Sequence, residues 1–313
     1  MTNLNKKTLL SQAFKAHNKR LVSLERDALN ALAVVATSSK ATPPDWDACL
    51  PQNLQASQSA QPQKIIRQHA AYFLFVQCAL QYCFWEMDDG KPQHWWHGDK
   101  KGSGGCTALT IELYEKKLFP GLHLTDLEVT EKLWPFVEGM PLASSRLAIL
   151  AELADYGVFL GRVYQPIMRH KRVTTEIAAE MAEAFPQAFA DPFLKKAQLF
   201  LGMLVSNMKA RGVDLEADIT TFADYRLPQI LRHMGVLKYA PQLAQKVDSH
   251  QLLEEGSDEE VSIRAAMLRA CYTISLMTGL SDLEVDAWLF GQTRSESFES
   301  SAKPFHLTRT TNY

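Results

Sequence analysis

Residues 65–85 read IIRQHAAYFLFVQCALQYCFW, and this stretch decides the class of fold that the sequence predicts. A helix over these residues would be apolar on nearly all sides, so we expect it to run through the core. The most apolar part, Ala70 to Trp85, is interrupted by Gln77 and Gln81 and is shorter than the roughly 20 residues that cross a bilayer. The stretch therefore predicts a buried helix and not a membrane span.

Outward from this helix, apolar residues recur at spacings of three and four, which is the helical period. The sequence predicts an all-α protein, a compact multi-helix domain. Ser257 with Glu260 and Ser281 with Glu284 form capping-box patterns, which mark two helix starts near the C-terminus. Pro and small polar residues predict a linker or ordered loop at 38–63 and a long loop at 88–109, and the tail from 293 is polar. Helices are expected at 21–35, 107–117, 146–160, 175–185, 193–209, 228–234, 257–278 and 281–290.

The overall charge argues against a large nucleic-acid substrate. The 313 residues include 33 Lys and Arg against 35 Asp and Glu, and the net charge of -2 gives no broad basic field for binding a duplex. The five cysteines are an odd number, and three lie in apolar runs, which fits a reducing compartment. The N-terminal residues lack the apolar block of a secretory signal. We therefore expect a cytoplasmic protein without a membrane partner.

The segment 222–229, FADYRLPQ, contains the strongest candidate for chemistry. If Pro228 begins a helix, Leu227 is pushed toward extended geometry and Asp224 lies at the helix N-terminus. The partial positive charge there stabilises a carboxylate, which would then face a ligand. The alternative is that Asp224 only pairs with Arg226 or caps a turn. The residues alone leave both open.

Other clusters have plainer explanations beside the functional ones. His94 and His97 have a metal-like spacing, but no second close pair completes a zinc site, so none is expected. Gly102 to Gly105 lack the Lys-Ser/Thr ending of a nucleotide-binding loop. Phe84 and Trp85 would stack on a flat ring or belong to the core, and Lys195 would contact an anion or face solvent.

Taken in order, several segments resemble one family. Over about residues 70–313 the chain resembles the queuosine salvage proteins, the queuosine 5'-phosphate N-glycosylase/hydrolase family, and FADYRLPQ is the most specific of the shared motifs. The segments are FLFVQCALQYCFW at 73–85, FLKKAQ at 193–198, TFADYRLPQILRHMGVLKYAPQLAQKV at 221–247, GSDEEVSIRAAMLRA at 256–270, VDAWLF at 285–290 and HLTRTTNY at 306–313.

The resemblance implies an N-glycosyl hydrolase that cleaves queuosine 5'-monophosphate, and less efficiently queuosine, to release queuine for reinsertion into tRNA. It implies a helical architecture similar to that of DNA glycosylases and a free nucleotide as substrate. No metal, organic cofactor or direct nucleic-acid partner is expected. The protein is expected to be a monomer. Residues 1–62 are expected to form an N-terminal helix and linker packed on the body. Residues 63–313 would form the catalytic body, whose C-terminal tail closes the site.

The implied substrate sets the chemistry. Its 7-deazaguanine base has carbon in place of N7, so the leaving base is not activated by protonation at N7. The enzyme must stabilise an oxocarbenium-like sugar by covalent capture or by electrostatics, and a carboxylate suits both. Asp224 is assigned to this role as a hypothesis. The resemblance implies that Tyr225 or Arg226 orients Asp224, and that Gln229 belongs to the substrate-binding residues. It implies that Phe84 and Trp85 stack on the base. The residues implied for contacting phosphate or closing the pocket are Lys195, His306, Arg309 and Tyr313.

The chain departs from the family pattern at a few positions. Lys196 stands where the family usually has arginine, and this change loses bidentate geometry if the side chain holds a ligand. Leu227 replaces valine, which is a mild apolar change. In the tail, Leu307 replaces a basic residue and Asn312 an aromatic one, which weakens the case for phosphate contacts there.

Two other classes of protein stay open. One is a non-catalytic binder of a modified nucleobase or nucleotide, which would bind substrate without turnover. The other is a glycosylase that acts on a base within nucleic acid, whose binding would depend steeply on salt. The net charge of -2 counts against the second.

Overall fold

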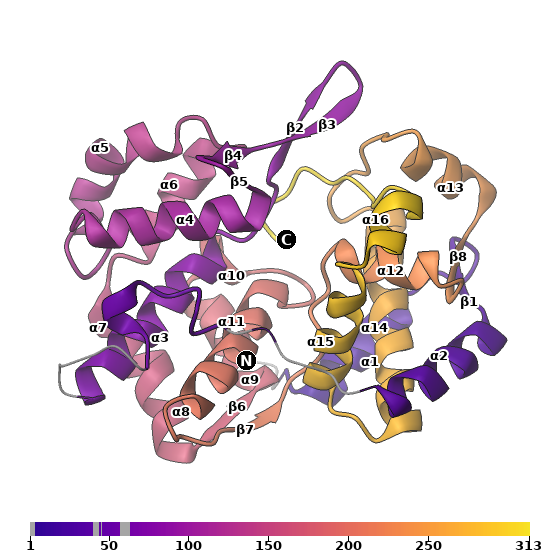
Figure 1. Ribbon diagram of the computed structural model, residues 1–313, viewed down its shortest axis with the longest axis horizontal. Helices are drawn as coiled ribbons and strands as arrows, with labels where there is room; N and C mark the ends of the chain where they lie inside the picture. Colours follow the sequence, from indigo (N-terminus) through magenta and orange to yellow (C-terminus); the bar gives the residue numbers. More distant parts are fainter. Residues whose placement is uncertain (1–3, 40–43, 45, 57–62) are drawn as a thin grey trace. The chain divides into compact units, whose positions relative to one another are not determined.

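The computed structural model describes residues 4–39, 44, 46–56 and 63–313 (Figure 1). Helices dominate, and the strands of the described residues are short and form two-stranded sheets. The structure thus confirms the all-α class. Contacts group the chain into two units: unit 1 comprises the described residues of 1–44 and 219–311 with Tyr313, and unit 2 those of 45–218 with Asn312. The division predicted at residues 62 and 63 stays a prediction.

Unit 1 is built around one long helix, α14 (Asp258–Thr278). It contacts the helices α1, α2, α12 and α15. A short antiparallel sheet pairs β1 with β8, so that Val22 lies opposite Tyr239. The other elements of the unit are α1 (Lys6–Ala16), β1 (Val22–Leu24), α2 (Arg26–Ser38), α12 (Arg226–His233), β8 (Leu237–Tyr239), α13 (Pro241–Asp248), α15 (Asp282–Gln292) and α16 (Glu296–Ser301).

The capping signals predicted for the last long helices are confirmed. The Ser257 hydroxyl accepts the backbone N–H of Glu260 and begins α14, and Gly279 ends it in the left-handed conformation at φ 74°. At α15 the capping box of Ser281 and Glu284 is complete. The polar tail, which composition alone made look disordered, contains α16 and several buried residues.

Unit 2 combines helices with three small sheets. The sheets pair β2 with β3, β4 with β5, and, in parallel, β6 with β7. Its elements are the 3-10 helix η1 (Gln52–Leu54), α3 (Gln63–Ala79), β2 (Trp85–Asp88), β3 (Lys91–His94), β4 (Trp96–His97), β5 (Lys100–Lys101), α4 (Gly102–Glu115), α5 (Asp126–Val137), α6 (Ala143–Glu152), α7 (Tyr156–Phe159), the π-helix η2 (Leu160–Tyr164), α8 (Gln165–His170), β6 (Arg172–Thr174), α9 (Thr175–Ala184), α10 (Pro186–Phe189), α11 (Lys195–Lys209) and β7 (Glu216–Asp218).

The core of unit 2 forms around α3, as the sequence predicted. Every residue from Ala70 to Ala79 is buried, and α3 packs against α11. The ring of Phe75 lies within 5.4 Å, centroid to centroid, of four other phenylalanine rings. The predicted end of this helix was wrong, however: α3 stops at Ala79, and Trp85 begins strand β2.

The predicted loop at 88–109 is also different in the structure. It contains the hairpin of β2 and β3, which stands out in Figure 1, and the β4–β5 pair, and α4 already begins at Gly102. The Gly-rich run is therefore the first turn of α4. A Cβ at Gly105 would lie 2.8 Å from the Lys100 carbonyl oxygen, so glycine is needed for close packing against β5 and not for a phosphate.

A buried guanidinium binds the backbone that follows the C-terminal end of α3. Arg146 has no exposed surface, and its nitrogens donate to the carbonyl oxygens of Leu80, Tyr82, Cys83 and Pro141 at 2.7–3.1 Å. The first three of these carbonyls follow the last turn of α3, and that of Pro141 precedes α6. Carbonyls at the end of a helix lack helical partners, so a cation is a natural partner for them. Arg146 also lies over the Tyr82 ring, 4.1 Å from its centroid.

We predict that Arg146→Met destabilises the protein by about 3–5 kcal/mol, because the buried carbonyls of Tyr82, Cys83 and Pro141 lose the guanidinium that donates to them and that of Leu80 loses one of its donors. Urea unfolding would measure this loss. Arg162→Met is the matched control: Arg162 is exposed, and its replacement should change stability by about 0.5 kcal/mol or less. Equal stability of the two variants would contradict the role given to Arg146.

Candidate active site around Asp224

Asp224 is held in one orientation by the start of α12. Its Oδ1 accepts the backbone N–H groups of Arg226 at 2.8 Å and Leu227 at 3.1 Å. Its other oxygen, Oδ2, accepts no hydrogen bond from a described residue, and the side chain is half-buried. The carboxylate therefore has one oxygen fixed and one available to a substrate.

The predicted start of this helix was wrong by two residues. α12 begins at Arg226, so Leu227 is helical and not extended, and Pro228 is the third residue of the helix. Asp224 explains the earlier start, because its Oδ1 takes up the first two free N–H groups of α12. Pro228 fits there since its missing N–H would have had no partner within the first turn. Asp224 thus caps the start of α12 through Oδ1, and no described residue donates a hydrogen bond to Oδ2.

The segment before Asp224 is anchored from two helices. Asp286 of α15 accepts the N–H of Phe222 through Oδ2 at 2.8 Å. Arg264 of α14 donates through Nε to the carbonyl oxygen of Ala223 at 2.9 Å. Arg264 is also paired with Glu260 at 3.1 Å, and both side chains are almost fully buried. Side chains from both α14 and α15 therefore hold the backbone just before Asp224.

The residues after Asp224 bind the rest of unit 1. The guanidinium of Arg226 donates to Oε1 of Gln229 at 2.9 Å and to the carbonyl of Thr293, and Gln229 donates to the carbonyl of Lys303. Arg226 thus reaches Asp224 through its backbone N–H and not through an ion pair. The ring of Tyr225 lies 4.5 Å from that of Phe305, centroid to centroid. These contacts join α12 to the C-terminal tail.

The C-terminal tail supplies a second buried cluster in unit 1. His306 and Tyr313 are 2% and 3% exposed, and His306 Nε2 lies 3.2 Å from the Tyr313 hydroxyl. The Tyr313 ring covers the guanidinium of Arg264 at 4.3 Å. Burial, helped by the Arg264 charge, lowers the pKa of His306 to about 3. Arg309 is exposed.

Three predicted binding residues belong to unit 2. Phe84 and Trp85 are buried, and the Phe84 ring lies 5.3 Å from the guanidinium of Arg146. Lys195 is 6% exposed, and its ammonium donates to the carbonyl of Gln81 at 3.3 Å. In this structure Lys195 holds the backbone that follows α3, Phe84 lies beside Arg146, and Trp85 begins β2. Their roles in stacking the base and contacting phosphate stay predictions.

The histidine pair considered for a metal has another partner. His97 Nε2 lies 2.8 Å from Oε2 of Glu112, and the part of the chain that the structure describes shows no cluster of metal-ligating side chains. Within the same residues no helix is both long and apolar enough to span a bilayer.

Comparison with known proteins identifies the family. The model of the queuosine salvage protein family matches residues 60–313. The chain belongs to this family. A relative from Sphaerobacter thermophilus, named queuosine 5'-phosphate N-glycosylase/hydrolase, is 29% identical over 93% of each chain. Relatives of the same name from Dictyostelium discoideum and Bos taurus are 27% and 26% identical, over 78% and 97% of each chain.

The family position at Lys196 has a structural explanation. Lys196 is completely buried, donates to the carbonyl of Ala79 at 3.0 Å and lies over the Tyr82 ring. Burial, with the charges of Lys195 and Arg146, lowers its pKa to about 7. A single acceptor suits an ammonium, so in this structure the change from arginine to lysine affects the contacts at the end of α3.

No role was predicted for Arg264 or Asp286, although both hold the backbone just before Asp224. Both lie in segments that carry the family resemblance, VSIRAAMLRA and VDAWLF. Each is a charged residue inside an apolar helical run, and such a residue is buried only when it is paired. That pattern was the available signal. The sequence could not show that both side chains reach the backbone at 222–223.

We predict that His306 makes the protein less stable in acid. Its folded pKa of about 3 lies below the ordinary value of 6.5, so between these values the proton binds only to the unfolded chain. The stabilisation is complete above pH 6.5 and is lost progressively as the pH falls toward 3. From pH 7 to pH 5 the loss should be about 2 kcal/mol.

Urea unfolding of the wild type and of His306→Gln at both pH values would isolate this contribution. The variant should lose clearly less stability between pH 7 and pH 5, because glutamine takes up no proton. An identical pH dependence in the two proteins would contradict the buried, neutral state of His306.

Proposed function

We propose that this chain hydrolyses the N-glycosidic bond of queuosine 5'-monophosphate, and of queuosine, to release queuine, and that Asp224 is its catalytic carboxylate. Membership of the queuosine salvage protein family and the names of the relatives support the reaction. The observation that supports the residue is the carboxylate itself: two backbone N–H groups bind Oδ1, and Oδ2 accepts no hydrogen bond from the residues that the structure describes.

The chemistry requires a group that stabilises positive charge on the sugar. The bond between C1′ and the base nitrogen breaks, and its electron pair leaves with the 7-deazaguanine base. Oδ2 of Asp224 then either forms a bond to C1′ or stabilises the cation without a bond. Water then adds its oxygen to C1′ and displaces Oδ2 where that bond has formed. One of its protons goes to the base nitrogen and the other stays on the new C1′ hydroxyl, so that the products are queuine and ribose 5-phosphate.

The fixed geometry of Asp224 is what makes this electrostatic role effective. Its fixed oxygen needs no reorganisation when charge develops on the sugar, because the two N–H groups already hold the side chain in place. Tyr225, Arg226 and Gln229 support this arrangement through contacts within unit 1.

We further propose that the substrate is a free nucleotide, that no nucleic acid is bound directly and that the protein acts in the cytoplasm. The net charge of -2 supports the first two points. All five cysteines are free thiols, and four of them are buried, which supports a reducing compartment.

Asp224→Asn should lower kcat for queuosine 5'-monophosphate by at least about a thousandfold while leaving substrate affinity nearly unchanged. Asparagine keeps an oxygen that can accept both N–H groups, so the change removes the charge and keeps the fold. Purified protein would be incubated with queuosine 5'-monophosphate, queuosine and guanosine 5'-monophosphate, and the free base followed by mass spectrometry.

Asp214→Asn is the matched control, because Asp214 is exposed in the same stretch of sequence and should not affect turnover. Release of queuine by the wild type and by this control, but not by Asp224→Asn, is the expected result. Binding without release in the wild type would instead indicate a binder of the modified nucleotide. A transient mass increase on the quenched wild-type protein would distinguish covalent capture from electrostatic stabilisation.

Asp286 should act as a positioning residue. We predict that Asp286→Ala lowers kcat by about ten- to a hundredfold with little change in KM, because the N–H of Phe222 loses its acceptor and Asp224 shifts. Asp286→Asn keeps an acceptor and should restore most of the activity. If both variants were equally impaired, the charge of Asp286 and not its hydrogen bond would be responsible.

A further inference from the structure

Two adjoining pockets lie in unit 2, on elements that the proposed chemistry does not use. They have volumes of about 410 Å³ and about 360 Å³, and both are lined by Asn53, Tyr114 and Lys117. The second is also lined by His69, His123 and Tyr156. These residues come from η1, α3, the end of α4, the loop before α5 and the start of α7. The second pocket is the candidate binding site.

The loop before α5 fixes His123 as a hydrogen-bond donor. The backbone N–H of Phe119 donates to Nδ1 of His123 at 3.2 Å, so Nδ1 carries no proton. In the neutral ring the proton is then on Nε2, which is left to donate. The loop itself is closed by the bond from the N–H of His123 to the carbonyl of Phe119 at 2.8 Å. The donor is therefore preorganised.

Tyr156 adds a donor that the protein leaves unused. Its hydroxyl is buried and has no hydrogen-bond partner among the described residues. The His69 ring meets the Tyr156 ring edge to face, 5.7 Å between centroids. A buried hydroxyl without a partner costs about 1–3 kcal/mol, so its presence beside a pocket indicates a missing partner.

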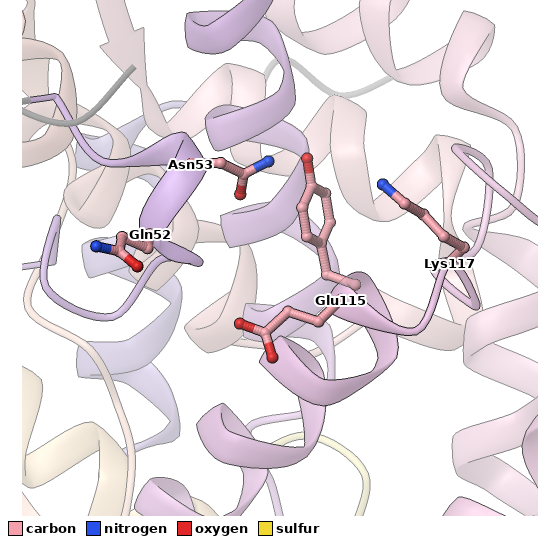
Figure 2. A pocket seen from close by; sticks show the side chains of 5 residues that line it. Gln52, Asn53, Glu115 and Lys117 are labelled. Carbon is pink, nitrogen blue, oxygen red and sulfur yellow. The ribbon is translucent and has the colours of Figure 1, made fainter. Parts of the chain in front are cut away.

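The charges around the pocket favour an anion. Among the residues that the structure describes, no Asp or Glu lines the second pocket, whereas Lys117 does. The first pocket includes Glu115, but Figure 2 shows the Glu115 carboxylate and the Lys117 ammonium pointing in different directions. Asp155, close to this region, already accepts the N–H of Val158 as the cap of α7. Burial lowers the pKa of His69 and of His123, and the Lys117 charge lowers that of His123 further.

We propose that this pocket binds the oxyanion group of a small molecule, a phosphate or a carboxylate, through Lys117, His123 and Tyr156. The three residues come from separate elements and line the same pocket, and a compact oxyanion is bound by donors that converge in this way. The rings of Tyr114 and Tyr156 provide apolar surface for the rest of the ligand. The site is independent of Asp224 and of the proposed function.

Inorganic phosphate is the probe for this proposal. The full chain would be titrated with phosphate at pH 7 and constant ionic strength, while the Cε1–Hε1 NMR signals of His69 and His123 are recorded and assigned with His→Gln variants. We expect saturable shifts of both signals. Saturating phosphate should raise the pKa of His123 by about one unit or more, because a bound anion favours the charged ring. Acetate in place of phosphate shows which oxyanion is preferred.

Two variants and one control complete the test. Lys117→Met and Tyr156→Phe should each weaken phosphate binding by about tenfold or more. Tyr156→Phe should not reduce stability, since its hydroxyl has no partner to lose. Lys116→Met is the matched control, because Lys116 pairs with Glu112 and does not line the pocket, and it should bind phosphate as the wild type does.

Shifts no larger than those in chloride alone would overturn the proposal. Equal binding by Lys117→Met, Tyr156→Phe and the wild type would also overturn it. Because both reporters lie in this pocket, neither result depends on whether Asp224 is catalytic.

Discussion

A buried guanidinium must find acceptors, and this constraint organises both units. In unit 2 Arg146 donates to the carbonyls that follow α3, and in unit 1 Arg264 donates to the carbonyl of Ala223. Both arginines are essentially without solvent contact, so an unpaired guanidinium would cost several kcal/mol. In each case the carbonyls belong to an irregular segment that helical hydrogen bonds cannot satisfy. The arginine thus fixes the backbone just before residues with a predicted role, Phe84 in one unit and Asp224 in the other.

The sequence predicted the long helices because their signals are local. The apolar run of α3, the caps at Ser257 and Ser281 and the stop at Gly279 depend on residues a few positions apart. The end of α3 could not be predicted, because the cations that replace its missing hydrogen bonds come from α6 and α11. The short strands were missed for a similar reason, since β1 is defined only by its pairing with β8.

The candidate site was predictable in its chemistry and not in its supports. FADYRLPQ indicated a carboxylate at a helix start, and the structure has one, although the helix begins earlier than Pro228 suggested. Proline lacks a backbone N–H, and every position in the first turn of a helix tolerates this loss. Pro228 therefore did not identify the first residue of the helix. Arg264 and Asp286 lie far along the chain from Asp224, so only the fold brings their side chains to this backbone. His306 and Tyr313, predicted for substrate contact, are buried against Arg264 in this structure.

The order of the chain within unit 1 has a consequence for biosynthesis. Unit 1 is discontinuous: the early helices α1 and α2 pack against α14, and the strand at Val22 pairs with the strand at Tyr239. Unit 2 is made from the continuous stretch between them. During translation the inserted unit can therefore complete its core first, while α1 and α2 have emerged from the ribosome without α14 to pack against. The early helices then expose apolar faces for most of synthesis, and the anchored backbone before Asp224 forms only when the last part of the chain arrives.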